Sequence, residues 1–296
     1  MDSATYPAAA LSTNPSLFSS LEPPARLGVF GDPVAHSISP AMHNAALQKD
    51  GFAMQYVRLH ATAEEFPAAA LALAGAGFLG ANVTIPHKTA ALEVCDDLDE
   101  HARITGAVNT LVVDGGRLGG FSTDGPGLVR AVREEFFVDL RDLRVMVLGA
   151  GGGAGRSIAV QCALEKCERL VLVNRTAEKA AALARELAAH FRSDRLVGPA
   201  ERCIAVPWEE KAIAAALDGC DLLINATSIG LRRTDPSPIT PSLLTPNLLV
   251  FDTIYSAGRT KLVENATAAG ARACDGLSML LHQGALSYEI WTNRPA

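Results

Sequence analysis

Two side chains in this sequence, Lys88 and Asp124, could together transfer a proton. Lys88 follows the apolar run 78–83, and Asp124 follows the apolar run 118–121. A neighbouring carboxylate orients a lysine amine, and a cleft adjusts the pKa of that amine so that it can act as acid or base. Taken alone, Lys88 could equally be a solvated helix residue and Asp124 a helix cap.

Hydroxyl and amide side chains lie at the ends of the same and neighbouring apolar runs. They are Ser37, Ser39, Thr84, Asn109 and Thr123. In an open α/β sheet such positions converge on one crevice, where they suit a ligand with several hydroxyl groups. Each has a simpler alternative, because serines also cap helices and asparagine also forms turns.

A glycine-rich turn lies between two further apolar runs. The run 144–148 leads into five glycines between Gly149 and Gly155, then a helical stretch over 156–166 and a second run over 170–173. This order of strand, turn, helix and strand is typical of a dinucleotide-binding unit, and Gly149-x-Gly151-x-x-Ala154 fits its fingerprint. The glycines alone could also form only a flexible corner.

The residues after the second run indicate which dinucleotide would bind. An NAD site has an acidic residue here that binds the ribose 2′-hydroxyl. This chain instead has Asn174, Arg175 and Thr176, with Lys179 one turn later and no carboxylate before Glu178. Two cations suit a 2′-phosphate, so the sequence predicts NADP(H).

Composition excludes several other classes of protein. A net charge of −6 without a basic cluster argues against a nucleic-acid surface. No apolar run approaches the ~20 residues needed to cross a bilayer. The six cysteines form no C-x-x-C and no zinc-ligand spacing, so we expect no metal and a reducing, cytoplasmic location.

The order of predicted elements indicates two α/β domains with a cleft between them. The substrate-binding domain would comprise 26–124 and 278–296, and a Rossmann-type dinucleotide domain would comprise 125–277. Asp114-Gly115-Gly116 predicts a hairpin turn. Residues 1–25 are rich in Ser, Ala and Pro and resemble no targeting signal, so we expect a disordered extension.

Seven segments, in order, resemble the shikimate dehydrogenase family over residues 26–291. They are 31–43 with Ser37-x-Ser39, 81–88 with Thr84 and Lys88, 106–110 with Asn109, 122–125 with Thr123-Asp124, and 225–228, 252–255 and 276–283. The resemblance implies NADP-dependent interconversion of 3-dehydroshikimate and shikimate, in the pathway to chorismate and the aromatic amino acids.

The resemblance also implies roles for individual residues. Lys88 would be the acid and base, paired with Asp124. Ser37 and Ser39 would hold the substrate carboxylate, Tyr255 would reach the substrate from the other domain, and the ring hydroxyls would be bound by Thr84, Asn109, Asp124 and Gln283.

On the cofactor side, the resemblance assigns the pyrophosphate to Gly149, Ala150, Gly151, Gly152 and Gly153, and the 2′-phosphate to Asn174, Arg175, Thr176 and Lys179. Thr253 and Gly276 would lie near the nicotinamide, and Glu100 falls at a cofactor-associated position.

The sequence departs from the family pattern at a few places. Ser122 stands where the family usually has Asn, and Lys179 where it often has Arg. The glycine turn is one residue longer than usual, with Gly153 as the expected insertion. The chain also ends soon after Trp291, where the resemblance leads us to expect a further helix.

Three alternatives stay open beside shikimate dehydrogenase. One is a relative that acts on quinate or on both compounds, and another is a sensor that keeps the fold without turnover. The third is a tetrahydrofolate-linked dehydrogenase, against which Ser37-x-Ser39 and Thr123-Asp124 argue. The expected partner is a small-molecule substrate, and the sequence leaves a homodimer open.

Overall fold

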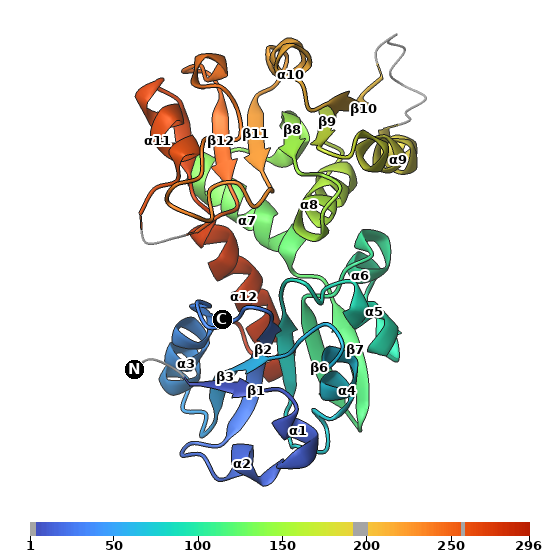
Figure 1. Ribbon diagram of the computed structural model, residues 1–296, viewed down its shortest axis with the longest axis vertical. Coiled ribbons are helices and arrows are strands. Elements are labelled where there is room, and N and C mark those ends of the chain that lie inside the picture. The colour runs from blue at the N-terminus through green and yellow to red at the C-terminus, as the bar shows by residue number, and fades with distance from the viewer. Residues whose placement is uncertain (1–3, 192–200, 256–257) are drawn as a thin grey trace. The chain divides into compact units, whose positions relative to one another are not determined.

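The computed structural model describes residues 4–191, 201–255 and 258–296 (Figure 1). The chain forms two compact units. The first comprises Met1–Thr123 and Gln283–Ala296, and the second comprises Asp124–His282. The chain therefore passes between units next to Asp124 and again next to Gln283.

The first unit is built on a seven-stranded mixed sheet of order β1-β3-β2-β4-β6-β7-β5. Its strands are β1 (Thr5–Pro7), β2 (Ala25–Gly31), β3 (Gln55–His60), β4 (Gly80–Val83), β5 (Asp97–Leu98), β6 (Thr110–Asp114) and β7 (Arg117–Phe121). β6 runs antiparallel to both β4 and β7, and the other pairs are parallel. The predicted hairpin is confirmed, because Gly115 and Gly116 both have positive φ, at 55° and 83°, as its tight turn requires.

Short helices connect these strands. They are α1 (Ala10–Thr13), α2 (Ser16–Ser19), α3 (Ser39–Lys49), α4 (Phe66–Leu71), α5 (Ala90–Val94) and α6 (Glu100–Thr105). The C-terminal part of α12 (Leu277–Thr292) also belongs to this unit. A Cβ added at Gly284 would lie 2.2 Å from Met42 Cε, so the glycine permits close contact between α12 and α3.

The N-terminal segment corrects an expectation. Residues 4–25 are ordered rather than disordered, since β1 pairs with β3 and the helices α1 and α2 follow it. Phe18 is fully buried and makes edge-to-face contacts with Tyr6 and Phe78. The few large apolar side chains of this segment are enough to attach it to the core, despite its Ser- and Pro-rich composition. The residues Met1 to Ser3 lie outside the described part of the chain.

The second unit contains a six-stranded parallel sheet of order β10-β9-β8-β11-β12-β13. Its strands are β8 (Arg144–Leu148), β9 (Arg169–Asn174), β10 (Cys203–Pro207), β11 (Leu222–Asn225), β12 (Leu249–Asp252) and β13 (Arg272–Cys274). This order is that of a doubly wound dinucleotide-binding sheet, whose direction of winding reverses between β8 and β11. Ligands of such sheets bind at the carboxyl ends of the strands beside that reversal.

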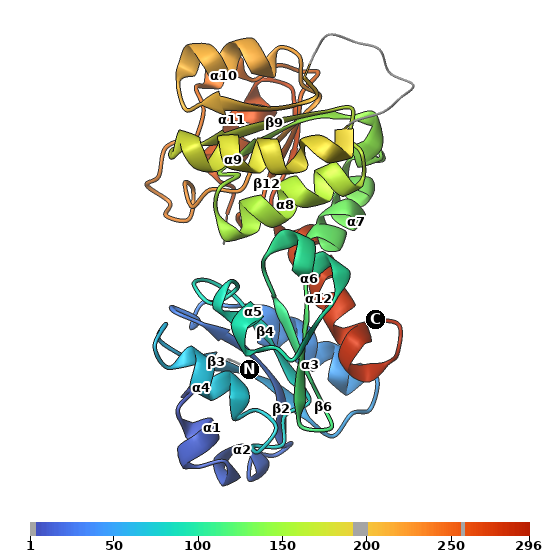
Figure 2. The ribbon, with the colours of Figure 1, turned by 90° about the vertical axis from the view of Figure 1, so that its right-hand side faces the viewer.

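The second sheet carries α7 (Asp124–Phe136), α8 (Gly153–Leu164), α9 (Ala177–Leu187), α10 (Glu210–Leu217) and α11 (Lys261–Ala268). Figure 2 shows α8 and α9 side by side across this sheet. The residues of β8 from Val145 to Leu148 are fully buried, as expected for a central parallel strand. Because β8 is fixed in the core of this unit, it also fixes the start of the glycine turn that follows it.

Candidate active site

Ser37 lies in the loop between β2 and α3, and Ser39 is the first residue of α3. Both residues are buried, and the main-chain N–H of Ser39 donates to the hydroxyl of Ser37 at 3.3 Å. The capping position of α3 is Ile38, whose side chain makes no capping hydrogen bond. The two hydroxyls thus lie together at the start of α3.

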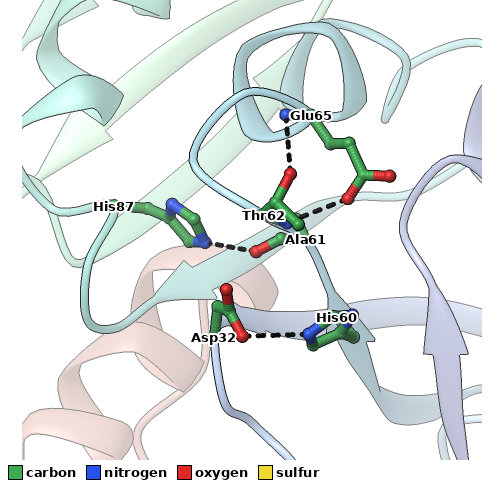
Figure 3. A network of polar contacts seen from close by, with 6 residues as sticks. All are labelled: Asp32, His60, Ala61, Thr62, Glu65 and His87. Atoms are coloured by element: carbon green, nitrogen blue, oxygen red, sulfur yellow. Dashed lines mark hydrogen bonds and ion pairs between the residues drawn. The ribbon is translucent and has the colours of Figure 1, made fainter.

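Lys88 lies in the loop that follows β4, and His87 anchors that loop. The His87 ring is buried and stacks on Phe66, with ring centroids 4.6 Å apart. Its Nε2 donates to the carbonyl oxygen of Ala61 at 2.8 Å (Figure 3). Burial lowers the pKa of His87, so the neutral ring donates this bond. Lys88 itself is half-buried, and its carbonyl accepts from Val108 N at 2.9 Å.

A second set of contacts stabilises the turn next to Ala61, whose carbonyl oxygen accepts from His87. The main-chain N–H of Thr62 donates to Glu65 Oε2 at 2.9 Å, and Glu65 N donates to Thr62 Oγ1 at 3.3 Å (Figure 3). This reciprocal arrangement has the pattern of a capping box and lies in the turn that leads into α4. Next to it, His60 Nε2 lies 3.0 Å from Asp32 Oδ1. The Ala61 carbonyl that accepts from His87 therefore lies between His60 and Thr62, which are each held by a side-chain contact.

Asn109 is the centre of a buried amide and hydroxyl cluster. Its Nδ2 donates to Thr123 Oγ1 at 2.8 Å and to Gln283 Oε1 at 3.1 Å, and its Oδ1 accepts from Thr123 N at 2.8 Å. The structure thus brings together three candidate site residues, which lie directly before β6, two residues after β7 and in α12. The next residue after Thr123 is Asp124, which is buried and begins α7.

A further polar layer, which the sequence analysis did not identify, supports Asn109. Asn82 donates through Nδ2 to the carbonyl of Asn109 at 3.1 Å and to Ser287 Oγ at 3.0 Å. Ser287 also lies 2.8 Å from Thr110 Oγ1, and Tyr56 donates its hydroxyl to Asn82 at 2.7 Å. The available signal was a polar residue at 82 and at 110 inside apolar strands, where only a hydrogen-bonded side chain is tolerated.

Ser122 and Glu100 both lie near α6. Ser122 is buried, and its hydroxyl accepts from Thr105 Oγ1 at 3.4 Å. Its main-chain N–H donates to Asp99, which caps α6 through Ala102 N at 2.7 Å. Glu100 is exposed in the first turn of α6, within the first unit, so the glycine turn of the second unit does not include it.

The glycine turn after β8 has three positions where a side chain cannot fit. Gly149 has a φ of 83°, and a Cβ there would lie 2.9 Å from Ala226 O. A Cβ at Gly151 would lie 2.8 Å from Asn174 Nδ2, and one at Gly155 would lie 2.1 Å from Gly149 O. The third fingerprint position is therefore Gly155 and not Ala154, which corrects the predicted spacing. Gly153 begins α8 and faces open space.

The predicted 2′-phosphate residues lie beside this turn. Asn174 ends β9 and donates through Nδ2 to Thr176 O at 3.0 Å, while Arg175, Thr176 and Lys179 are exposed. A hollow of about 210 Å³ is lined by Ala150, Gly151, Arg156, Lys179, Ala182, Leu183 and Glu186. The one carboxylate among the described residues that line this hollow, Glu186, forms an ion pair with Arg156, with Oε1 and Nη2 2.6 Å apart. The bare main chain at Gly151 and the adjacent cations fit a phosphorylated dinucleotide.

Thr253 and Gly276 lie against each other at the end of β12. A Cβ at Gly276 would lie 2.1 Å from Thr253 O, and Thr253 N donates to Asn225 O at 3.0 Å. The residue before Thr253, buried Asp252, accepts from Asn225 Nδ2 at 2.9 Å and from Thr260 Oγ1 at 2.6 Å. Burial raises the pKa of Asp252 and also that of half-buried Tyr255.

The described residues contain neither a metal site nor a helix that could span a membrane. Among residues 4–191, 201–255 and 258–296, no three His, Cys, Asp or Glu side chains gather as a metal site, and all six cysteines are free thiols. None of the helices described has the length and hydropathy of a membrane-spanning segment.

The strand-end residues of the first unit and the glycine turn of the second define a dinucleotide-binding α/β enzyme. Comparison with known proteins gives the family. The family model "Shikimate dehydrogenase substrate binding domain" matches residues 29–111, "Shikimate / quinate 5-dehydrogenase" matches 131–206, and "Shikimate 5'-dehydrogenase C-terminal domain" matches 276–296.

Relatives and solved structures agree with these models. The NADP⁺ shikimate dehydrogenase of Methanopyrus kandleri is 40% identical over 91% of each chain, and the quinate/shikimate dehydrogenase of Escherichia coli is 36% identical over 90% of this chain and 92% of its own.

A shikimate dehydrogenase crystallised with NADP⁺ superposes with a TM-score of 0.82, at 34% identity over 91% of this chain and 90% of its own. The Thermus thermophilus enzyme with NADP(H) and shikimate gives 0.79, at 36% identity over 92% and 94%. This chain belongs to the shikimate dehydrogenase family.

Proposed function

We propose that the chain catalyses the reversible NADP(H)-dependent reduction of 3-dehydroshikimate to shikimate. As a member of its family it is an oxidoreductase that acts on a CH–OH group with NADP(H). The observation that carries the substrate assignment is the buried cluster of Asn109, Thr123 and Gln283. An amide cluster at the end of a sheet offers both donors and acceptors to a ligand with several hydroxyls.

In this proposal the first unit binds the substrate. The hydroxyls of Ser37 and Ser39 receive the carboxylate. Ring hydroxyls bond to Thr84, Asn109 and Gln283, and Asp124 accepts a hydrogen bond beside them. Tyr255 of the second unit would contact the bound substrate.

Lys88 moves the proton. In the reducing direction its ammonium donates to the oxygen of the reacting carbonyl, and in the oxidising direction the neutral amine takes the hydroxyl proton. Asp124 would orient the Lys88 amine. The bound cofactor supplies or accepts the hydride at the ring carbon.

The second unit binds NADP(H) in this proposal. Main-chain N–H groups at the start of α8 receive the pyrophosphate, since Gly149, Gly151 and Gly155 leave the backbone bare. Arg175 and Lys179, with Asn174 and Thr176, would hold the 2′-phosphate, and Thr253 and Gly276 would border the nicotinamide.

A broader quinate/shikimate dehydrogenase is the second candidate, and Ser122 favours it. Its buried side chain is shorter than the asparagine that the family usually has there, which leaves more room around the ring. The relative from Escherichia coli named for both substrates shares 36% identity.

The experiment compares shikimate oxidation by the unaltered chain and by Lys88→Ala. Turnover of shikimate with NADP⁺ by the unaltered chain tests the substrate. In Lys88→Ala, kcat should fall by about 10²–10⁴, the usual contribution of general acid–base catalysis, with little change in KM. Lys49→Ala, which removes an exposed lysine at the end of α3, is the matched control. A Lys88→Ala enzyme with near-normal kcat would refute the role of Lys88.

A further inference from the structure

Arg58 is a buried cation in the middle of β3. It is only 8% exposed, and a buried guanidinium is costly unless its N–H groups are hydrogen-bonded. Its Nε and Nη2 both donate to the main-chain carbonyl oxygen of Ser37, at 3.0 and 2.7 Å. The guanidinium is thus fixed directly behind the turn that carries Ser37 and Ser39.

The contacts around this turn form one continuous chain. Arg58 holds the carbonyl of Ser37, the hydroxyl of Ser37 accepts from Ser39 N, and Ser39 is the first residue of the eleven-residue helix α3. The N-terminus of a helix carries partial positive charge, and an arginine keeps its full charge at any physiological pH. The Arg58 guanidinium and the N-terminus of α3 therefore both contribute positive potential near the two hydroxyls.

We infer that Arg58 is a positioning residue for the substrate carboxylate. This inference rests on the proposed function, in which Ser37 and Ser39 receive that carboxylate. Arg58 holds the Ser37 main chain through its carbonyl oxygen, and its charge favours an anion near the two hydroxyls. The hydroxyls of Ser37 and Ser39 are neutral donors, so the positive charge that attracts a carboxylate comes from the Arg58 guanidinium.

The test compares Arg58→Gln and Arg58→Lys with the unaltered chain. Arg58→Gln should raise KM for shikimate roughly tenfold, because the Ser37 turn loses two charged hydrogen bonds and the nearby positive charge, while kcat and KM for NADP⁺ stay within about twofold. Arg58→Lys keeps the charge without the two-pronged geometry and should recover part of the loss. If Arg58→Gln fails to fold, the same split is measured on Arg58→Lys alone.

Arg26→Gln is the matched control. Arg26 lies in the adjacent strand β2, is half-buried, and also donates to a main-chain carbonyl, that of Gly77, at 2.9 Å. It should leave KM for shikimate unchanged. An unchanged KM in Arg58→Gln, or equal losses in kcat and in KM for both ligands, would overturn the inference alone. Absence of shikimate turnover in the unaltered chain would overturn the proposed function and this inference with it.

Discussion

At the scale of single residues, Arg175 and Lys179 are the side chains that we propose distinguish NADP(H) from NAD(H). Both are exposed next to the glycine turn, and the Lys179 Cβ lies 2.8 Å from the position of a Cβ on Gly151. A planar guanidinium matches a phosphate group in two hydrogen bonds, whereas an ammonium acts as a point charge. Arg175 should therefore contribute more than Lys179 to the recognition of NADP(H).

Arg175→Ala should raise KM for NADPH far more than KM for NADH, because only NADPH carries the 2′-phosphate. Initial rates with each cofactor at saturating substrate measure both constants. Arg185→Ala, at the exposed end of α9, is the control and should change neither. Equal increases for the two cofactors would contradict the 2′-phosphate role.

His43 couples the stability of the first unit to pH. It is buried and stacked on Tyr56 with centroids 4.4 Å apart, and its Nε2 has no hydrogen-bond partner among the described residues. Burial lowers the pKa of His43 from 6.5 to about 3. Below pH 6.5 the His43 ring is protonated in the unfolded chain but stays neutral in the native protein. The free energy of unfolding therefore decreases as the pH falls.

His43→Phe should flatten this dependence. Between pH 6 and pH 4 the unaltered protein should lose about 1.4 kcal/mol per pH unit through this one group, and the variant should lose correspondingly less. Urea unfolding at several pH values gives the slope. His36→Gln changes an exposed ring and serves as the control. An unchanged slope in His43→Phe would show that His43 is protonated in the native state.

At the scale of secondary-structure elements, the turn between β8 and α8 depends on one close contact. Gly155 lies against the carbonyl of Gly149 so tightly that a methyl group would lie 2.1 Å away, while Gly153, two residues earlier, has open space. The same substitution at these two glycines should therefore have opposite consequences.

Gly155→Ala should reduce the free energy of unfolding by about 1–3 kcal/mol, as overpacking does, and should raise KM for NADP⁺. Gly153→Ala should be neutral or slightly stabilising, because alanine loses less backbone entropy on folding. Denaturant unfolding and cofactor titration of both variants provide the comparison. Equal damage at both positions would mean that the turn adopts another conformation.

The elements of this fold were largely predictable, and the exceptions have physical reasons. Apolar runs and Gly or Pro boundaries located the strands and helices of both sheets. They could not show that Phe18 would order the N-terminal segment, because one aromatic contact outweighs a polar composition there. Spacing alone also placed Ala154 where Gly155 makes the contact.

The sequence was enough to propose the residues of the candidate site that lie next to strands and helix starts, but not the residues that support them. Ser37, Thr84, Lys88 and Asn109 were proposed from position, chemistry and family resemblance. The supporting bonds of Asn82 and Ser287 join residues about two hundred positions apart in the chain. No local pattern encodes such a pair, so only the fold shows it.

At the scale of the whole molecule, the proposed site residues are divided between the two units. The first unit presents hydroxyls, amides and Lys88, and the second presents the glycine turn and its cations. The chain passes between units next to Asp124 and next to Gln283, so both connections are made at proposed substrate residues. Family membership and the residues of each unit together support one overall activity.

The most direct measurement is the initial rate of oxidation of shikimate and of quinate, each with NADP⁺ and with NAD⁺, on the purified protein. We predict that shikimate with NADP⁺ has the highest kcat/KM of the four pairs by a wide margin. Comparable rates with quinate or with NAD⁺ would contradict that specificity and would point to the broader enzyme and to Ser122. A folded protein that binds NADPH but turns over none of the four pairs would contradict the proposed activity and favour a ligand sensor.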